Sequence, residues 1–145
     1  MRLVLDASVA LKWFFRAKTD ERDADTASEL LTAYAAGRHE LLAPPHFQAE
    51  MCAVLAREAP DAMADHLADL LDLAIPVRGD AAVYARAMQL SRDLDHPLFD
   101  TLYHAVALET EGSVLVTADA RYFAKASESG QIQLLSQWPE NQGAG

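Results

Sequence analysis

The chain has 145 residues, of which 51% are hydrophobic and 23% are charged, a balance that suits one globular domain with its own core. Its formal net charge is -10, from 12 Lys and Arg against 22 Asp and Glu, which argues against broad electrostatic binding of nucleic acid because such binding relies on basic side chains. The single cysteine, Cys52, excludes a disulfide within the chain and fits a reducing compartment.

The first predicted element is a short apolar run, residues 3–5, which ends at the carboxylate of Asp6. Such a run bounded by a turn is typical of a strand buried on both faces, as in a parallel sheet. Four further strands are predicted at 40–43, 74–77, 114–117 and 132–135, and Pro76 makes the second of these an edge strand. Helical spacing of apolar residues predicts helices over 8–15, 24–36, 47–58, 61–73, 80–92, 99–110 and 120–127, with a mixed-charge loop at 16–23.

Strands and helices alternate along the whole chain. This alternation predicts an α/β fold in which helices cover both faces of a parallel sheet. We expect a single domain over residues 1–136, followed by a loose tail over 137–145. Asp6 and Lys12 interrupt the apolar N-terminus, and no other segment is apolar for long enough to span a bilayer, so we expect a cytoplasmic protein.

Four acidic residues lie where solvation alone explains them poorly. Asp6 and Asp119 each follow a buried strand, Glu50 shares a helix face with apolar residues, and Asp100 opens a strongly apolar helix. Each has a simple structural explanation, since the aspartates can cap helices and Glu50 can pair with Arg57. Taken singly, these explanations and a functional one are about equally good. Their joint placement favours function, because ligands of such sheets bind at the carboxyl ends of the strands.

A cluster of carboxylates points to a particular chemistry. Carboxylates held close together repel one another, and a divalent cation removes that cost. Mg²⁺ prefers hard oxygen ligands, and no Cys or His set has zinc spacing, so Mg²⁺ or Mn²⁺ is favoured over zinc. A cation held in this way activates water for hydrolysis of phosphodiesters.

Four short motifs surround these acids. They are Leu3-Val4-Leu5-Asp6-Ala7-Ser8-Val9, Glu50 in its helix, Phe99-Asp100-Thr101-Leu102-Tyr103 with Ala105-Val106-Ala107, and Leu115-Val116-Thr117-Ala118-Asp119. In this order they resemble a PIN domain and, more narrowly, a VapC-type toxin, the ribonuclease of a type II toxin–antitoxin pair. The resemblance runs from Arg2 to about Leu135.

The resemblance implies a three-layer α/β/α sandwich around a mostly parallel sheet of about five strands. It implies an endoribonuclease in which Asp6, Asp100 and Asp119 bind Mg²⁺ directly or through water, while Glu50 completes the cluster and helps to orient the attacking water. Ser8 and Thr117 match small hydroxyl positions that hold a carboxylate or water. It further implies a homodimer, an RNA substrate, and a cognate antitoxin whose arginine would enter the acidic site.

Two positions depart from the family pattern. Many relatives carry an asparagine three residues after the glutamate, where this chain has Ala53, so one contact around the metal is in question. His104 occupies a position that is often aliphatic, and it lies one turn after Asp100, so it faces the same side. With Asp100 it could bind Mn²⁺ or zinc, but a histidine that is structural or supports a metal ligand is favoured. His96 is interpreted as a loop histidine.

Two other functions remain open. A PIN-like fold without catalysis would be a binding module, which the four acids argue against and Ala53 leaves open. A haloacid-dehalogenase-like phosphatase also uses an aspartate after the first strand, but it requires another two residues later, where this chain has Ser8.

Overall fold

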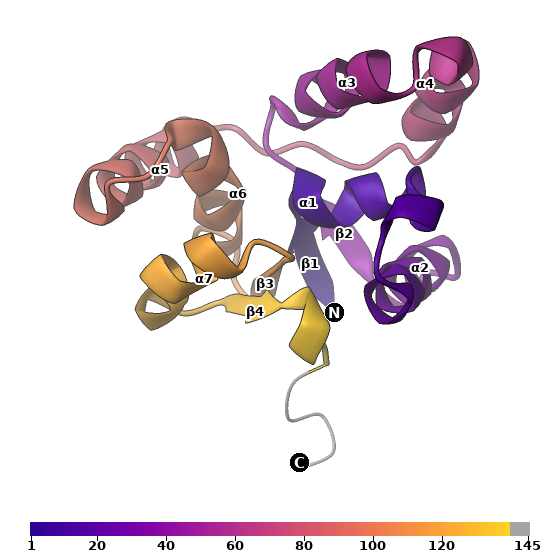
Figure 1. Ribbon diagram of the computed structural model, residues 1–145. Helices are drawn as coiled ribbons and strands as arrows, with labels where there is room; N and C mark the ends of the chain where they lie inside the picture. The colour runs from indigo at the N-terminus through magenta and orange to yellow at the C-terminus, as the bar shows by residue number, and fades with distance from the viewer. Residues whose placement is uncertain (140–145) are drawn as a thin grey trace.

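A parallel β-sheet forms the centre of the computed structural model, which describes residues 1–139 (Figure 1). Its strands are β1 (Arg2–Leu5), β2 (Glu40–Leu42), β3 (Ser113–Thr117) and β4 (Ile132–Leu134), in the order β2-β1-β3-β4. Every neighbouring pair is parallel, and Leu3 lies opposite Leu41 on one side and Val114 on the other. The two apolar strands β1 and β3 are therefore adjacent at the centre, as expected for strands buried on both faces.

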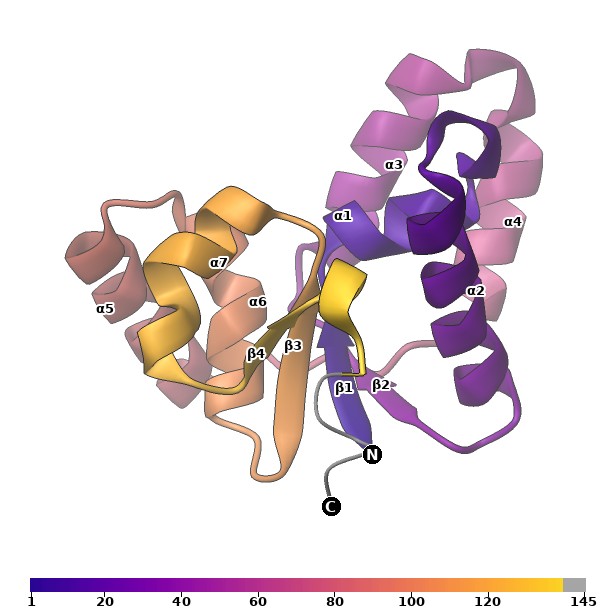
Figure 2. The same cartoon turned by 60° about the horizontal axis from the view of Figure 1, so that its bottom comes forward.

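Helices connect these strands. They are α1 (Ala7–Ala10), α2 (Glu21–Ala35), α3 (Phe47–Glu58), α4 (Met63–Asp72), α5 (Ala81–Leu94), α6 (Leu98–Leu108) and α7 (Ala120–Ala126). Figures 1 and 2 both place α2 and α6 on opposite sides of β1. The predicted α/β sandwich with helices on both faces is confirmed.

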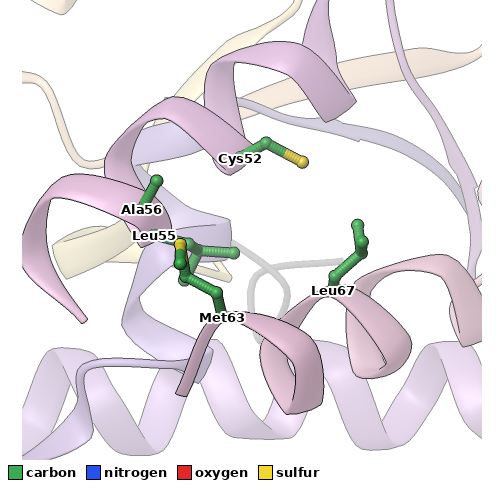
Figure 3. Close-up of a pocket in the computed structure, with 5 residues that line it drawn as sticks. All are labelled: Cys52, Leu55, Ala56, Met63 and Leu67. Carbon is green, nitrogen blue, oxygen red and sulfur yellow. The ribbon is translucent and has the colours of Figure 1, made fainter. Parts of the chain in front are cut away.

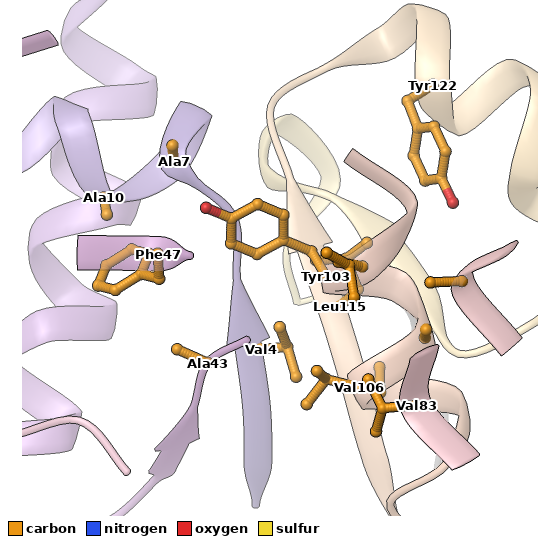
Figure 4. Packing of buried hydrophobic residues seen from close by; sticks show 14 of the residues in the cluster. Val4, Ala7, Ala10, Ala43, Phe47, Val83, Tyr103, Val106, Leu115 and Tyr122 are labelled. Carbon is orange, nitrogen blue, oxygen red and sulfur yellow. The ribbon is translucent and has the colours of Figure 1, made fainter. Parts of the chain in front are cut away.

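The core has one layer on each face of the sheet because successive residues of a strand point to opposite sides. Leu3 and Leu5 pack in a cluster with the apolar side of α2. Val4 and Leu115 point the other way and pack with Val106 of α6 in a larger cluster that includes residues of α3, α5 and α7 (Figure 4). Val4 and Leu115 are completely buried, so the two central strands are rigidly held where they end.

The sheet has four strands within residues 1–139, so the expectation of about five is wrong in this detail. The missing strand is the one predicted at 74–77, where only one isolated parallel bridge forms, between Ala43 and Val77. The Ala43 N–H donates to the Pro76 carbonyl, and the Arg78 N–H donates to the Ala43 carbonyl, each at 2.9 Å. Pro76 has no N–H of its own, so the ladder does not continue through it.

The N-terminal third differs from the prediction at two places. The helix predicted over 8–15 is a short α-helix that tightens into a 3₁₀ turn at Leu11–Trp13. The loop predicted over 16–23 ends earlier, because the Asp20 carboxylate accepts hydrogen bonds from the Arg22 and Asp23 amides and caps α2. The charged residues 21–23 are therefore the first turn of a helix.

The C-terminal segment begins in contact with the core. Trp138 packs against the cluster around Leu3 and lies edge-on to His39, so ordered packing extends beyond residue 136. The rest of the predicted tail, residues 140–145, lies outside the described residues. Among the described helices, none combines the length and the apolar character needed to cross a membrane.

Candidate metal centre

The four predicted carboxylates line one small cavity at the carboxyl edge of the sheet. Asp6 directly follows β1, and Asp119 lies just beyond the end of the neighbouring strand β3. Glu50 reaches the cavity from α3 and Asp100 from the first turn of α6. The cavity has a volume of about 70 Å³, and its lining is completed by Ala7, Ser8, Tyr103 and Tyr122.

Asp6 is held by two hydroxyl groups, one from α1 and one from the end of β3. Ser8 donates its hydroxyl hydrogen to Asp6 Oδ1, and Thr117 donates its own to Asp6 Oδ2. The Val9 amide lies 3.4 Å from Oδ1, so Asp6 also caps α1. Helix capping and a place in the acidic cluster are therefore compatible for this residue.

The same two hydroxyl groups join the ends of β1 and β3. Ser8 Oγ accepts a hydrogen bond from the Ala118 amide at 3.0 Å, and Thr117 Oγ1 accepts one from the Asp119 amide at 3.0 Å. Each hydroxyl thus donates to Asp6 and accepts from the backbone beside Asp119. The spacing between the two strand ends is fixed by these bonds.

Asp6 has an unusual proton affinity. Burial raises its pKa from 3.8 to about 6, the hydrogen bonds from Ser8, Thr117 and the Val9 amide oppose that rise, and the negative charge of Asp119 adds to it. Removing the carboxylate from water favours its neutral form. A positive charge in the cavity would reverse this balance.

Asp119 caps α7 with one of its two oxygens. Oδ1 accepts hydrogen bonds from the amides of Arg121 and Tyr122, both at 3.0 Å. Within residues 1–139, Oδ2 accepts no hydrogen bond from the protein. One oxygen fixes the side chain while the other remains available to a ligand.

Glu50 is oriented by Tyr103 of α6. The Tyr103 hydroxyl donates to Glu50 Oε1 at 3.0 Å, and His46 Nε2 lies 3.8 Å from Oε2. Burial, followed by the negative charge of Glu50, raises the pKa of Tyr103, so its hydroxyl remains a donor. The suggested ion pair between Glu50 and Arg57 is wrong, because Arg57 Nε bonds Glu58 at 2.9 Å on the exposed end of α3.

Asp100 has a neighbour that sequence reasoning missed. His96 Nε2 lies 2.9 Å from Asp100 Oδ2, and the His96 ring is almost buried, with 8% of its side chain exposed. His96, Asp100 and Asp119 each place one possible ligand atom within 4.8 Å of the others. The available signal was the spacing of four residues between His96 and Asp100, which the intervening Pro97 obscured.

His104 does not contact the four carboxylates, as a direct metal ligand would, and its contacts are those of a structural histidine. It is fully buried, with Nδ1 2.9 Å from the Tyr122 hydroxyl and Nε2 2.8 Å from the Gly130 carbonyl oxygen. Burial lowers its pKa, so the ring is neutral, donates from Nε2 and accepts at Nδ1. It contacts none of the four carboxylates and reaches the cavity only through Tyr122.

The profile of the PIN domain family matches residues 3–128, a range that contains every carboxylate of the cavity. The chain belongs to the PIN domain family. The structure of VapBC-1 from nontypeable Haemophilus influenzae has the same fold, with a TM-score of 0.63 and 17% sequence identity over 94% of this chain and 99% of that one. No curated protein matches this chain. Because the chain belongs to the PIN domain family, the alternative function of a haloacid-dehalogenase-like phosphatase has no support.

PIN domains are generally nucleases and typically bind divalent metal ions, and the cavity of this PIN domain suits such an ion. Its donors are carboxylate oxygens, the hard ligands that Mg²⁺ and Mn²⁺ prefer. Burial is the main cause of the raised pKa of Asp6 and the negative charge of Asp119 adds to it, and a bound cation would oppose both effects. The donor set and the electrostatics therefore fit a divalent metal.

A second cavity in this PIN domain has a different character. It lies between α3 and α4, has a volume of about 160 Å³, and is lined by Cys52, Leu55, Ala56, Met63 and Leu67 (Figure 3). Its carbon and sulfur lining contrasts with the carboxylates of the acidic cavity. Cys52, expected as a core residue, is half-buried in this lining.

Proposed function

We propose that this chain is a metal-dependent endoribonuclease and the toxin of a type II toxin–antitoxin pair. One observation carries the proposal: four carboxylates from four different elements line a single cavity of about 70 Å³ at the carboxyl edge of the sheet. The residues proposed to act in hydrolysis of RNA phosphodiester bonds are Asp6, Glu50, Asp100 and Asp119. Membership of the PIN domain family supports a nuclease, and RNA as the substrate and Mg²⁺ as the ion are our proposals.

Three aspartates are proposed to hold the ion. Asp6 and Asp119 would hold it from the ends of β1 and β3, and Asp100 would do so from α6. When bound, Mg²⁺ or Mn²⁺ lowers the pKa of a coordinated water and stabilises the attacking and leaving oxygens. Ser8 and Thr117 keep the Asp6 carboxylate in place by occupying one of its oxygens each.

Glu50 is proposed to orient the attacking water and to accept a proton from it. Its Oε1 is held by the Tyr103 hydroxyl at 3.0 Å, which leaves Oε2 for the water. A carboxylate positioned in this way serves as a general base when it lies within hydrogen-bonding distance of the water. Because the Tyr103 ring is buried in the core, its hydroxyl fixes the position of the Glu50 carboxylate.

The acidic protein must still attract a polyanion. The formal net charge is -10, and a divalent ion in the cavity reverses the local sign where the scissile phosphate would bind. Arg121 and Lys125 of α7 lie beside Asp119 and His96, respectively, and are proposed to meet phosphates of the substrate. Binding is therefore expected to depend on the metal more than on the overall charge.

An antitoxin is the proposed protein partner, supported by the likeness to VapBC-1 and by two surfaces of this chain. The acidic cavity suits an arginine, because a guanidinium binds carboxylates bidentately. The exposed face of α4 carries Met63, Leu67 and Leu71 at 43–50% exposure, a suitable apolar contact area. We further propose that the chain forms a homodimer in the cytoplasm. A small arginine-bearing protein encoded in the adjacent gene would support the proposed antitoxin.

RNA cleavage by the purified protein tests the proposal. Cleavage is measured with Mg²⁺ or Mn²⁺ and with EDTA, beside the variants Asp6→Asn and Asp65→Asn. Asp65 is an exposed residue of α4, so Asp65→Asn makes the same chemical change away from the cavity. We expect EDTA and Asp6→Asn to abolish cleavage and Asp65→Asn to retain it.

Two results would count against the proposal. Cleavage that persists in Asp6→Asn would mean that the acidic cavity is not the active site. No cleavage with either ion would favour the second candidate, a PIN domain that binds without cutting. The observation behind that candidate is Ala53, exposed on α3 where many relatives carry an asparagine.

A further inference from the structure

Lys125, His96 and Asp100 form a chain of hydrogen bonds that leads from α7 to the acidic cavity. The Lys125 ammonium lies 3.3 Å from His96 Nδ1 and also donates to the Asp95 carbonyl at 3.1 Å. His96 Nε2 lies 2.9 Å from Asp100 Oδ2. Neither Lys125 nor His96 belongs to the four carboxylates proposed to act in catalysis.

The direction of these bonds follows from the chemistry of the donors. An ammonium group has hydrogens to donate and no lone pair, so His96 Nδ1 must be the acceptor in the contact with Lys125. A neutral imidazole that accepts at Nδ1 carries its hydrogen on Nε2. Nε2–H therefore donates to Asp100 Oδ2, and its nitrogen has no lone pair to offer a metal ion.

The His96 side chain is held in place by packing, whereas the side chain of Asp100, which it contacts, is largely exposed. Its ring packs against Tyr122 with centroids 4.8 Å apart, and its backbone N–H donates to the Ser91 carbonyl at 3.1 Å. Only 8% of the His96 side chain is exposed, whereas 47% of the Asp100 side chain is exposed. Without His96, the Asp100 carboxylate would lose the contact that restricts its rotation.

We propose that His96 is a positioning residue: it donates Nε2–H to Asp100 Oδ2 and orients this carboxylate for the metal ion, while Lys125 fixes the required tautomer. The inference rests on the proposed function, in which Asp100 is a metal ligand. Groups that orient ligands in this way typically change metal affinity by about 10- to 100-fold when they are removed. His96 thus acts by orienting Asp100 and forms no direct bond to the ion.

Mn²⁺ binding to the full-length protein, followed by electron paramagnetic resonance, tests this assignment without relying on cleavage. His96→Phe keeps a ring against Tyr122 and removes the donor, whereas His96→Gln keeps an N–H donor at a similar reach. We expect His96→Phe to weaken Mn²⁺ binding by about tenfold or more and His96→Gln by less than about threefold. His66→Phe, which changes a histidine packed on Phe14, is the matched control and should bind Mn²⁺ like the native protein.

The results separate this inference from the proposed function. Native affinity in a folded His96→Phe variant would overturn the inference alone. A pulsed resonance signal from a directly bound imidazole nitrogen in the native protein would also overturn it, since His96 would then be a ligand, and this measurement needs no variant. An absence of Mn²⁺ binding by the native protein would overturn both the inference and the metal-dependent function.

Discussion

The Thr117 hydroxyl donates to Asp6 Oδ2 across 111 residues of sequence, and Thr117 Oγ1 also accepts a hydrogen bond from the Asp119 amide. Thr117 is fully buried at the end of β3. This hydroxyl therefore connects the Asp6 carboxylate to the backbone of Asp119 and joins the two central strands where they end.

Replacing Thr117 by valine should destabilise the protein. The change keeps the shape of the side chain but leaves Asp6 Oδ2 and the Asp119 amide each without a partner. We expect a loss of about 1–3 kcal/mol in the free energy of unfolding, measured with urea. Thr32→Val, at an exposed position of α2, is the control and should change stability by less than about 0.5 kcal/mol. Equal stability of the two variants would contradict the bridging role.

The pH dependence of stability without metal should reveal Asp6. Its folded pKa of about 6 exceeds the usual 3.8, so the native state binds this proton more tightly and gains stability as pH falls through 6. The lowered pKa of His104 acts in the opposite direction below its usual 6.5. Comparison with Asp6→Asn isolates the first effect. In EDTA, the native protein should gain about 1 kcal/mol relative to Asp6→Asn between about pH 7.5 and about pH 5. A constant difference would contradict the raised pKa.

Metal binding should stabilise the fold. An ion that binds only the native state adds about 2.7 kcal/mol when its concentration is 100 times its Kd. Thermal unfolding in Mg²⁺ or Mn²⁺ should therefore occur at a higher temperature than in EDTA. Asp119→Asn should reduce the increase, because it weakens a proposed ligand oxygen. An equal increase in Asp119→Asn would place the ion elsewhere.

Tyr103→Phe should slow cleavage while the protein stays folded. The change removes the hydroxyl that holds Glu50 Oε1 and keeps the ring packed against Phe47 and His46. We expect cleavage to fall by about tenfold, less than the roughly 10²–10⁴-fold that a general base itself contributes, because Glu50 remains present but is no longer held. The stability loss should be about 1 kcal/mol. Unchanged cleavage would show that Glu50 needs no such support.

His104→Leu should act mainly on stability. The histidine is fully buried and satisfies both the Tyr122 hydroxyl and the Gly130 carbonyl, so its loss should cost about 2–4 kcal/mol. Mn²⁺ affinity should stay within about threefold of native, because His104 contacts none of the carboxylates. A loss of Mn²⁺ affinity as large as in His96→Phe would restore His104 to the metal centre.

The sequence predicted the central relationship of the site for a physical reason. Strands that end in acids must bring those acids to one edge if the sheet is parallel, so Asp6 and Asp119 could be placed together from the chain alone. Glu50 and Asp100 were candidates because of their helix positions, and the family resemblance supported their place in the cluster, since a helix can present a side chain to many places.

Other features depended on tertiary contacts that a pattern does not contain. His96 and His104 each lie four residues from Asp100, one before it and one after, and only packing decides which of them contacts it. The segment at 74–77 has strand-like residues, yet Pro76 limits it to one bridge beside Ala43. Asp20 is a residue type that commonly caps helices, yet α2 was predicted to begin at residue 24 and begins at Glu21.

The pairing of β1 with β3 has a consequence during synthesis. Asp6 is translated among the first residues, but Thr117 and Asp119 emerge only near the end, so a nascent chain holds an incomplete cluster until almost the whole protein has been made. A product truncated before β3 would lack the hydrogen bond from Thr117 to Asp6 and would also lack Asp119. The acidic cavity of this PIN domain is thus assembled only when translation is nearly finished.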